Sequence, residues 1–304
     1  MKIKSLAFSF VLIAALMFSI RATAQDLDSL MEKSVKPQIV FATATFKSTR
    51  VVNGHSVERM KKNQLEFRVS HRFGQFNTGS YEFYGLDQGT IHLALEYGLT
   101  DWLEVGIGRS TFEKTVDAFG KVSLLRQSNG ARNMPVALSY LASTEAISLN
   151  VDPAMKQNFS SRLTYVQQIM IARKFNESFS LQLTPTFIHR NIVPTEIEHN
   201  DLFSMGVGGR YKLSKRIAFN VEYFYVYRGN ETAMNQPNTG AIKYYNPLSV
   251  GIDIETGGHV FQIMVTNSQA MREGGFIGKT TGAWGNGGIR LGFNISRVFS
   301  FSKQ

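Results

Sequence analysis

Beyond its first sixty or so residues, the chain alternates apolar and polar positions with a period of two. In residues 203–213, apolar side chains or glycine occupy the odd positions, while serine, glycine, arginine and lysine occupy the even ones. Residues 91–99 and 217–227 repeat this pattern. Because successive side chains of a β-strand point to opposite faces, the pattern predicts strands with one apolar and one polar face.

The predicted strands are long. Strands of soluble sandwiches are usually about five or six residues, whereas a tilted membrane strand needs about nine to eleven. Tyr223, Tyr225 and Tyr227, followed by Tyr244 and Tyr245, are typical of an aromatic girdle at a bilayer surface. We therefore predict an all-β fold, an antiparallel transmembrane β-barrel. The pattern recurs at 64–73, 88–99, 102–111, 117–126, 134–143, 160–174, 177–190, 202–213, 216–228, 244–255, 258–268 and 287–301.

Tight and long connections separate these segments. Residues 98–101 form one of the tight turns, and residues 229–243 form one of the long links. From residue 202 onward the two kinds alternate, which is typical of short periplasmic turns and long external loops. Residues 111–133 do not fit either kind clearly.

The number of strands follows from the directions in which the first and last strands cross the membrane. With a periplasmic C-terminus, the last strand runs inward and the strand at 64–73 runs outward, which predicts about twelve strands. Residues 39–52 also read as β but have the wrong parity to begin that barrel. Three alternatives stay open for them: a place in the lumen, a place at the periplasmic mouth, or pairing with an unrecognised strand to give fourteen.

The N-terminus has the features of a secretory signal peptide. Lys2 and Lys4 precede an apolar run at 6–20, and Ala22-Thr23-Ala24 supplies small residues for cleavage after Ala24. The run of about 15 residues is short for a membrane helix of about 20. We therefore expect export to the outer membrane through a cleavable signal peptide.

Three parts of the chain follow. We expect a signal peptide at 1–24, an N-terminal periplasmic or lumen segment at 25–62, and the outer-membrane barrel at 63–304. Within the second part, residues 25–38 place apolar side chains at helical spacing and stop at Pro37, which predicts a short amphipathic segment on the periplasmic side.

Net charge and composition limit the classes of molecule that the protein is expected to bind. Removing the three basic residues of the signal lowers the net charge from +10 to +7. An exported chain without a clustered basic run has little access to nucleic acid, so we expect outer-membrane lipid as a partner and no nucleic acid. The sequence has no cysteine, so disulfides cannot stabilise it and a closed hydrogen-bonded barrel must.

Several short motifs stand out at the ends of the predicted strands and in their turns. They are His71-Arg72-Phe73-Gly74, Tyr84-Gly85-Leu86-Asp87, Glu96-Tyr97-Gly98-Leu99-Thr100, Gly257-Gly258-His259-Val260-Phe261-Gln262 and Gly292-Phe293-Asn294-Ile295-Ser296-Arg297-Val298-Phe299. With these motifs the chain resembles an uncharacterised family of Bacteroidetes outer-membrane β-barrel proteins, classed as a domain of unknown function. The resemblance covers the chain from about Lys33 to Phe301. It implies a single-domain barrel and no established activity.

The last strand adds a further expected partner. Asn286, Gly288, Leu291 and Phe293 resemble the C-terminal signal read by the barrel assembly machinery, although Ser302-Lys303-Gln304 follow the final aromatic.

The polar face of the predicted strands carries charges of both signs. These residues could line a narrow aqueous path, or they could pair into a plug of salt bridges and hydrogen bonds. Mixed sign argues against a strongly ion-selective pore. The candidate lumen-lining residues are Glu66, Arg68, Arg72, His92, Glu96, Arg210, Lys212, Asn220, Glu222, Asp253, Glu255, Arg290 and Asn294.

Catalytic and metal-binding motifs are missing from the sequence. The six histidines lack metal-ligand spacing, and the glycines at 106–108 and 206–209 lie inside predicted strands rather than in a nucleotide loop. We expect no catalytic residues, no metal and no cofactor. An outer-membrane hydrolase is the least favoured hypothesis. Its catalytic histidine and serine would have to be His71 with Ser70 or His259 with Ser268.

Two functions are left. The first is porin-like passage of a small polar solute along the mixed-charge row. The second is a structural, adhesive or accessory barrel that binds at its surface through long loops. The aromatic residues of those loops suit sugar or peptide contact. They are Phe76, Tyr81, Phe83, Tyr84, Phe276 and Trp284.

Overall fold

The computed structural model describes residues 38–149, 158–229 and 242–301. The predicted signal peptide at 1–24 lies outside the described residues, as does all but the last residue of the segment predicted at 25–38.

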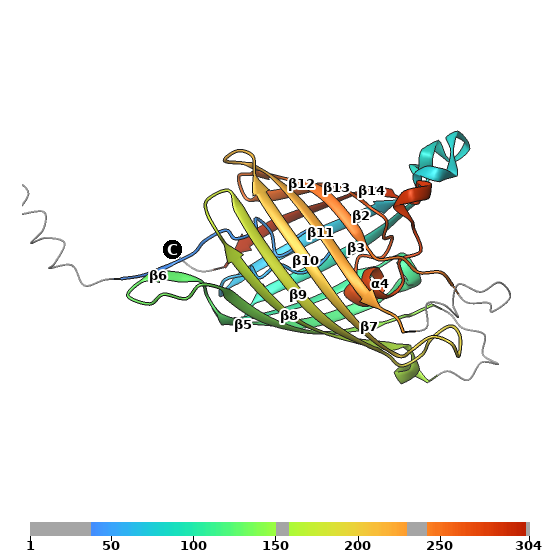
Figure 1. Cartoon of the computed structure of the whole chain (residues 1–304), viewed down its shortest axis with the longest axis horizontal. Helices are drawn as coiled ribbons and strands as arrows, with labels where there is room; N and C mark the ends of the chain where they lie inside the picture. The colour runs from blue at the N-terminus through green and yellow to red at the C-terminus, as the bar shows by residue number, and fades with distance from the viewer. Residues whose placement is uncertain (1–37, 150–157, 230–241, 302–304) are drawn as a thin grey trace, which may run out of the picture. The chain divides into compact units, whose positions relative to one another are not determined.

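Within the described residues, twelve antiparallel strands close into a barrel (Figure 1). The prediction of an all-β, twelve-stranded barrel is confirmed. Each strand pairs with the next barrel strand along the chain, and β14 closes the ring against β2, with Phe293 opposite His71. The barrel strands are β2 (Gln64–Phe73), β3 (Gly89–Gly98), β4 (Leu103–Ser110), β5 (Val116–Leu125), β7 (Ala137–Ala146), β8 (Leu163–Lys174), β9 (Phe179–Arg190), β10 (Asp201–Lys212), β11 (Ile217–Tyr227), β12 (Leu248–Thr256), β13 (His259–Thr266) and β14 (Arg290–Ser300).

The outer wall of the barrel is apolar. Leu93, Ile107 and Phe203 lie on it with their side chains exposed, whereas their neighbours in sequence face inward. Tyr223, Tyr225 and Tyr227 are also exposed on this wall, at the end of β11. An apolar outer band with an aromatic margin is what lipid contact requires of a transmembrane barrel.

The two ends of the barrel differ in the length of their connections. Turns at 99–102 and 213–216 join strands at one end, which we take as periplasmic by the usual rule. Longer links lie at the other end and contain η1 (Phe76–Thr78), η2 (Ser80–Gly85), η4 (Phe159–Arg162), α4 (Glu273–Gly278) and η5 (Trp284–Asn286).

One pair of connections breaks this rule. The external link at 111–115 is short and holds only η3 (Phe112–Lys114), whereas the periplasmic link at 126–136 is long. The long link contains β6 (Ser128–Gly130), which pairs with β1 (Ile39–Phe41). This exchange of lengths explains why residues 111–133 fitted neither kind of connection in the sequence.

Among the described residues, contacts assign 38–40 and 129–133 to a small unit and the barrel to a large unit. Within the small unit, Ala131 N donates to Gln38 O at 3.2 Å. In the described parts of the chain, no helix is long and apolar enough to span a membrane.

Residues 45–60, here called the N-terminal plug, lie inside the barrel and are almost entirely buried. The expectation of β-structure throughout 39–52 is wrong, because only β1 is a regular strand there. A closed barrel offers no free edge for another strand to join. The plug instead folds into a tight hairpin, in which Val51 N donates to Gly54 O at 2.9 Å and Ser56 N donates to Thr49 O at 2.9 Å.

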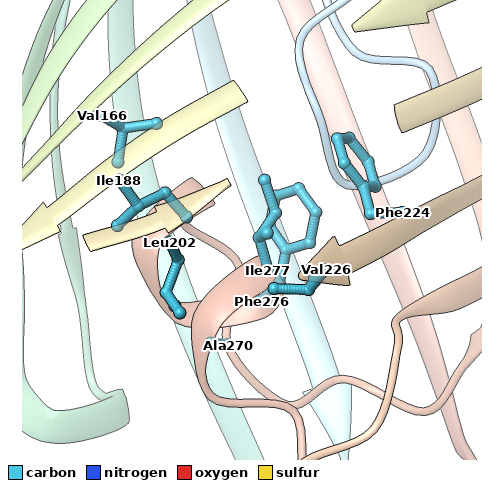
Figure 2. Close-up of a cluster of buried hydrophobic side chains, with 8 residues drawn as sticks. All are labelled: Val166, Ile188, Leu202, Phe224, Val226, Ala270, Phe276 and Ile277. Carbon is cyan, nitrogen blue, oxygen red and sulfur yellow. The ribbon is translucent and has the colours of Figure 1, made fainter. Parts of the chain in front are cut away.

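Residues 267–280, here called the loop plug, fold back into the barrel from the external end. They contain α4, all six residues of which are buried. Figure 2 shows Phe276 and Ile277 of this loop among inward-facing side chains of β8 to β11. The cluster consists of Val166, Ile188, Leu202, Phe224, Val226, Ala270, Phe276 and Ile277.

Candidate functional site: a filled polar lumen

The structure places the thirteen candidate lumen residues on the inward face of their strands. Eleven of them are buried, and the other two, Lys212 and Glu255, are partly exposed. In the part of the chain that the structure describes, the two plugs lie in the lumen that these side chains face. Most of them contact a plug or a neighbouring strand.

Glu222 on β11 holds the tip of the N-terminal plug. Its carboxylate accepts hydrogen bonds from the backbone N–H groups of Val52, Asn53 and Gly54, at 3.3, 3.1 and 3.0 Å. On the far side of the tip, Arg72 Nη2 donates to Asn53 Oδ1 at 2.7 Å. A buried carboxylate and a buried guanidinium thus each form hydrogen bonds to groups of the plug.

Asn294 and Asp253 lie close to this tip on neighbouring strands. Asn294 Nδ2 donates to Val52 O at 3.1 Å and to Gln262 Oε1 at 2.9 Å. Gln262 in turn donates to Asp253 Oδ1 at 2.9 Å. Asp253 of β12 and Asn294 of β14 therefore belong to one hydrogen-bonded network with the plug. Asn220 is buried beside them on β11.

Arg50 of the N-terminal plug meets the carboxylates of β2 and β3. Its Nη2 lies 3.0 Å from Glu96 Oε1, and the other oxygen of Glu96 lies 3.0 Å from Arg68 Nη2. Arg68 also pairs with Glu66. Thr49 of the plug donates to Glu96 Oε2 at 2.9 Å.

The plug is fixed a second time nearer the periplasmic end. Arg210 Nη1 donates to Thr45 O at 3.3 Å, and Lys47 pairs with Glu255. On the other side, Lys121 Nζ donates to Glu58 O at 2.6 Å. Another cation of the candidate row, Arg290, donates to Phe73 O at 3.3 Å near the external end.

The loop plug is held by carboxylates of β5 and β7. Arg272 Nε lies 3.2 Å from Asp117 Oδ2, and Gly274 N donates to Glu145 Oε1 at 2.7 Å. Asp117 also pairs with His92, the candidate residue of β3, at 2.9 Å.

The two plugs touch through His55 and Glu273, whose nearest side-chain atoms are 3.6 Å apart. Burial, reinforced by the neighbouring cation of Arg50, lowers the pKa of His55 well below its ordinary value. At neutral pH the imidazole is therefore uncharged, and it meets Glu273 as a neutral ring.

Several residues of this network were not found from the sequence. Four of them belong to the plugs and lie outside the strands with a period of two, so the alternation of apolar and polar positions could not identify them. They are Arg50, His55, Arg272 and Glu273. The wall residues did carry a signal. Glu104, Asp117, Lys121 and Glu145 each fall on the inward parity of strands in or beside the region 111–133, where the pattern was hardest to interpret.

Glycines of the wall make room for the N-terminal plug and for phenylalanine rings of neighbouring strands. A Cβ added at Gly208 would lie 3.6 Å from the Cβ of Val51 in the N-terminal plug. One added at Gly206 or Gly106 would collide with the ring of Phe224 or Phe119. The glycine runs at 106–108 and 206–209 thus serve close packing inside strands.

The cavities of the structure also differ from those of an open pore. A groove of about 890 Å³ lies on the outer wall, where Leu93, Leu95 and Ile107 contribute apolar side chains. A cavity of about 10 Å³ lies where the loop plug meets the external ends of β4, β5, β7 and β8. The latter has room for about one water molecule.

The histidine–serine pairs imagined for a hydrolase do not form. His71 stacks on Phe293 on the outer wall, whereas Ser70 is buried and faces inward. His259 begins β13 and Ser268 follows its other end. Among the described residues, no group of three or more histidines or acidic residues is placed to hold a metal ion.

Solved structures of similar shape are outer-membrane proteins of several kinds. The chain is similar to the NanC porin, with 9% identity and a TM-score of 0.45 over 79% of this chain and 100% of that one. It is also similar to an outer-membrane channel from Pseudomonas putida F1, with 12% identity and a TM-score of 0.41 over 80% and 97%.

A third similar structure is an active-site mutant of outer membrane phospholipase A from Escherichia coli, with 12% identity and a TM-score of 0.40 over 79% and 90%. These three scores are too low to carry a functional assignment. No curated protein matches the chain.

A family model gives the assignment that these structures do not. The family is described as "Membrane bound beta barrel domain (DUF5777)", and its model matches residues 46–299. The match runs from the N-terminal plug to the last strand, so the plug lies within the family domain. The apolar outer wall and closed strand ring agree with that description and with an outer-membrane location. The chain belongs to this family of membrane-bound β-barrels.

Proposed function

We propose that this barrel is an outer-membrane passage for a small polar solute, held closed by the N-terminal plug and the loop plug. Displacement of both plugs would leave a path lined by charged and amide side chains. A water-filled polar interior of that kind is what porins use.

One observation carries the proposal: much of the polar inner wall is satisfied by the plugs. Glu222 accepts from plug backbone, Arg72 donates to Asn53, and Arg272 pairs with Asp117. These contacts are hydrogen bonds and ion pairs, which water can replace when a plug leaves. Apolar contacts add to them at the loop plug, where Phe276 and Ile277 are buried.

The test uses a disulfide that locks the N-terminal plug to the wall. The chain contains no cysteine, and the Cβ distance of 3.6 Å between Val51 and an added Cβ at Gly208 falls within the range for a disulfide. Full-length protein with Val51→Cys and Gly208→Cys is recorded in a planar bilayer. Phe276→Ala is added to loosen the loop plug.

We expect current steps in the reduced protein and none in the oxidised protein. Val51→Cys with Val207→Cys is the matched control, because Val207 faces lipid on the same strand and cannot reach the plug. Its current should not respond to oxidation. Folded, heat-modifiable protein that stays silent in both states, or conducts equally in both, contradicts the proposal.

A second candidate function, surface binding, is favoured by the external loop between β2 and β3. Tyr81 and Phe83 are 93% and 60% exposed, and Tyr84 is exposed beside them. Phe83 and Tyr84 have positive φ, a strained conformation that costs about 1–3 kcal/mol for such residues. Of the other predicted loop aromatics, Phe276 is excluded from this surface because it is buried in the loop plug.

Sugar binding through this loop is directly testable. Wild-type protein should be retained on immobilised polysaccharide, and Tyr81→Ala with Phe83→Ala should lose retention while keeping the heat-modifiable fold. Equal retention of the variant and the wild type, or no retention of either, removes the candidate.

A further inference from the structure

Carboxylates face each other across neighbouring strands at two places in the lumen. Glu66 on β2 is directly opposite Glu96 on β3, and Asp117 on β5 is directly opposite Glu145 on β7. All four are buried. Like charges directly opposite one another destabilise a sheet, so each pair needs a cation close by.

The plugs supply a cation to each pair. Arg50 of the N-terminal plug lies 3.0 Å from Glu96, and Arg272 of the loop plug lies 3.2 Å from Asp117. Both guanidinium groups are buried, and they come from segments far apart in the sequence. The same chemical group therefore occupies both carboxylate pairs, and in each case it belongs to a segment that must leave before a solute can pass.

The wall itself supplies too few cations on this side. Strands β3, β4, β5 and β7, which the structure describes in full, carry four buried carboxylates on Glu96, Glu104, Asp117 and Glu145. Lys121 is their one buried lysine or arginine, and it pairs with Glu104 at 3.1 Å. Arg68 of β2 pairs with both Glu66 and Glu96, so the first carboxylate pair keeps this one wall cation. Departure of Arg50 and Arg272 would leave this side of the lumen with an excess of negative charge.

The sign of the wall therefore varies around the barrel. On β10 and β11 the buried charges are Arg210 and Glu222, one of each sign. Mixed charge in the candidate row argued against a selective pore, but five of the seven buried carboxylates of the barrel strands lie on β2, β3, β4, β5 and β7, and the other two are Glu222 and Asp253. Rings or clusters of carboxylates make pores cation-selective.

We propose that the opened barrel conducts small cationic solutes with a guanidinium or ammonium group, which bind the carboxylate pairs that Arg50 and Arg272 occupy in the closed barrel. This inference rests on the proposed passage. A guanidinium group can form two parallel hydrogen bonds with a carboxylate, so an arginine-like solute fits these pairs better than a compact ion does.

The reversal potential of the current in full-length protein under a potassium chloride gradient tests the inference. We expect it to shift toward the potassium equilibrium potential, and we expect arginine amide to reduce the current. Glu96→Gln with Asp117→Asn should bring the reversal potential close to zero and abolish the effect of arginine amide. Loss of the ion pairs to Arg50 and Arg272 should also make openings more frequent, so selectivity and opening are read separately.

Asp87→Asn with Glu177→Gln is the matched control, because it removes the same two charges from exposed positions in an external loop and a periplasmic turn. It should keep the cation preference. Glu145→Gln changes the second pair alone and provides an independent variant if the double variant does not fold.

Different outcomes would contradict the cation preference and the proposed passage of solute. Current without cation preference, or an unchanged reversal potential in folded Glu96→Gln with Asp117→Asn, overturns the inference alone. Absence of any current from folded wild-type and plug-loosened protein overturns the proposed passage and this inference with it.

Discussion

Phe276→Ala should release the loop plug from the lumen. Phe276 is fully buried, and its ring packs edge-on against Phe224 with centroids 5.3 Å apart. Truncation of a buried phenylalanine costs about 3–5 kcal/mol, which includes the cavity that the ring leaves. Because the barrel wall stays closed by its own hydrogen bonds, we expect most of this loss to weaken docking of the loop rather than the barrel.

The size of the effect follows from that free energy. At about 1.4 kcal/mol for each factor of ten, the population of undocked loop should rise by about 10²- to 4 × 10³-fold. Cleavage by a protease follows this population when opening and closing are fast relative to cleavage. The loop offers trypsin two sites, at Arg272, which is buried, and at Lys279, which pairs with Glu113 at 2.9 Å.

The assay is trypsin treatment of intact cells, with the C-terminal fragment followed over time. Wild-type protein should resist cleavage in this loop, and Phe276→Ala should be cut faster by about the factor above. Phe83→Ala, which removes the same ring from an exposed position, should leave the rate unchanged. Equal rates for Phe276→Ala and the wild type would refute the docking of this loop through its apolar contacts.

Four further predictions concern the N-terminal plug and the two faces of the barrel wall. Glu222→Ala leaves three backbone N–H groups of the N-terminal plug without an acceptor, at a cost of about 1–3 kcal/mol. A cysteine at position 52 (Val52→Cys) should then react with a water-soluble maleimide. Equal protection of that cysteine with and without Glu222→Ala would contradict the role of Glu222 in holding the plug. Because the pKa of His55 is lower in the folded protein than its ordinary value of 6.5, the plug should lose stability as pH falls below about 6.5. The maleimide labelling of Val52→Cys should rise over the same pH range. The same pH dependence in a His55→Gln variant would assign the effect to other groups. Leu93→Arg on the lipid wall should cost about 2–4 kcal/mol in refolding titrations. Ala94→Arg would lower the stability only slightly if the lumen were open. Because Ala94 is 3% exposed in a lumen filled by the plugs, we expect a severe loss of stability instead. A stability close to that of the wild type would contradict a filled lumen.

Strand alternation was sufficient to predict the wall of the barrel. In β10, Met205 and Val207 face lipid while Gly206 and Gly208 face inward, as the period of two requires. The number of strands followed because the connections alternate in length and the chain must close on itself. Both signals are local or topological, so a single sequence contains them.

The contents of the lumen could not be predicted in the same way. Arg50 and Arg272 reach their carboxylates only because a hairpin and a loop fold back into the barrel, and no periodic pattern marks a segment that does so. The aromatic and glycine-rich loop containing Phe276 looked like an exposed binding loop for that reason. Apolar inward positions such as Val166 and Ile188 were the available signal, because an open aqueous lumen would not favour them.

The presence of the N-terminal plug inside the barrel is tested most directly by disulfide formation in native outer membranes. Mild oxidation of the Val51→Cys, Gly208→Cys chain should form the intramolecular disulfide in nearly all molecules, because the two Cβ positions are 3.6 Å apart. The Val51→Cys, Val207→Cys chain should keep both thiols free under the same conditions. Free thiols in both chains, with the barrel folded, would place residues 45–60 outside the lumen and contradict the account.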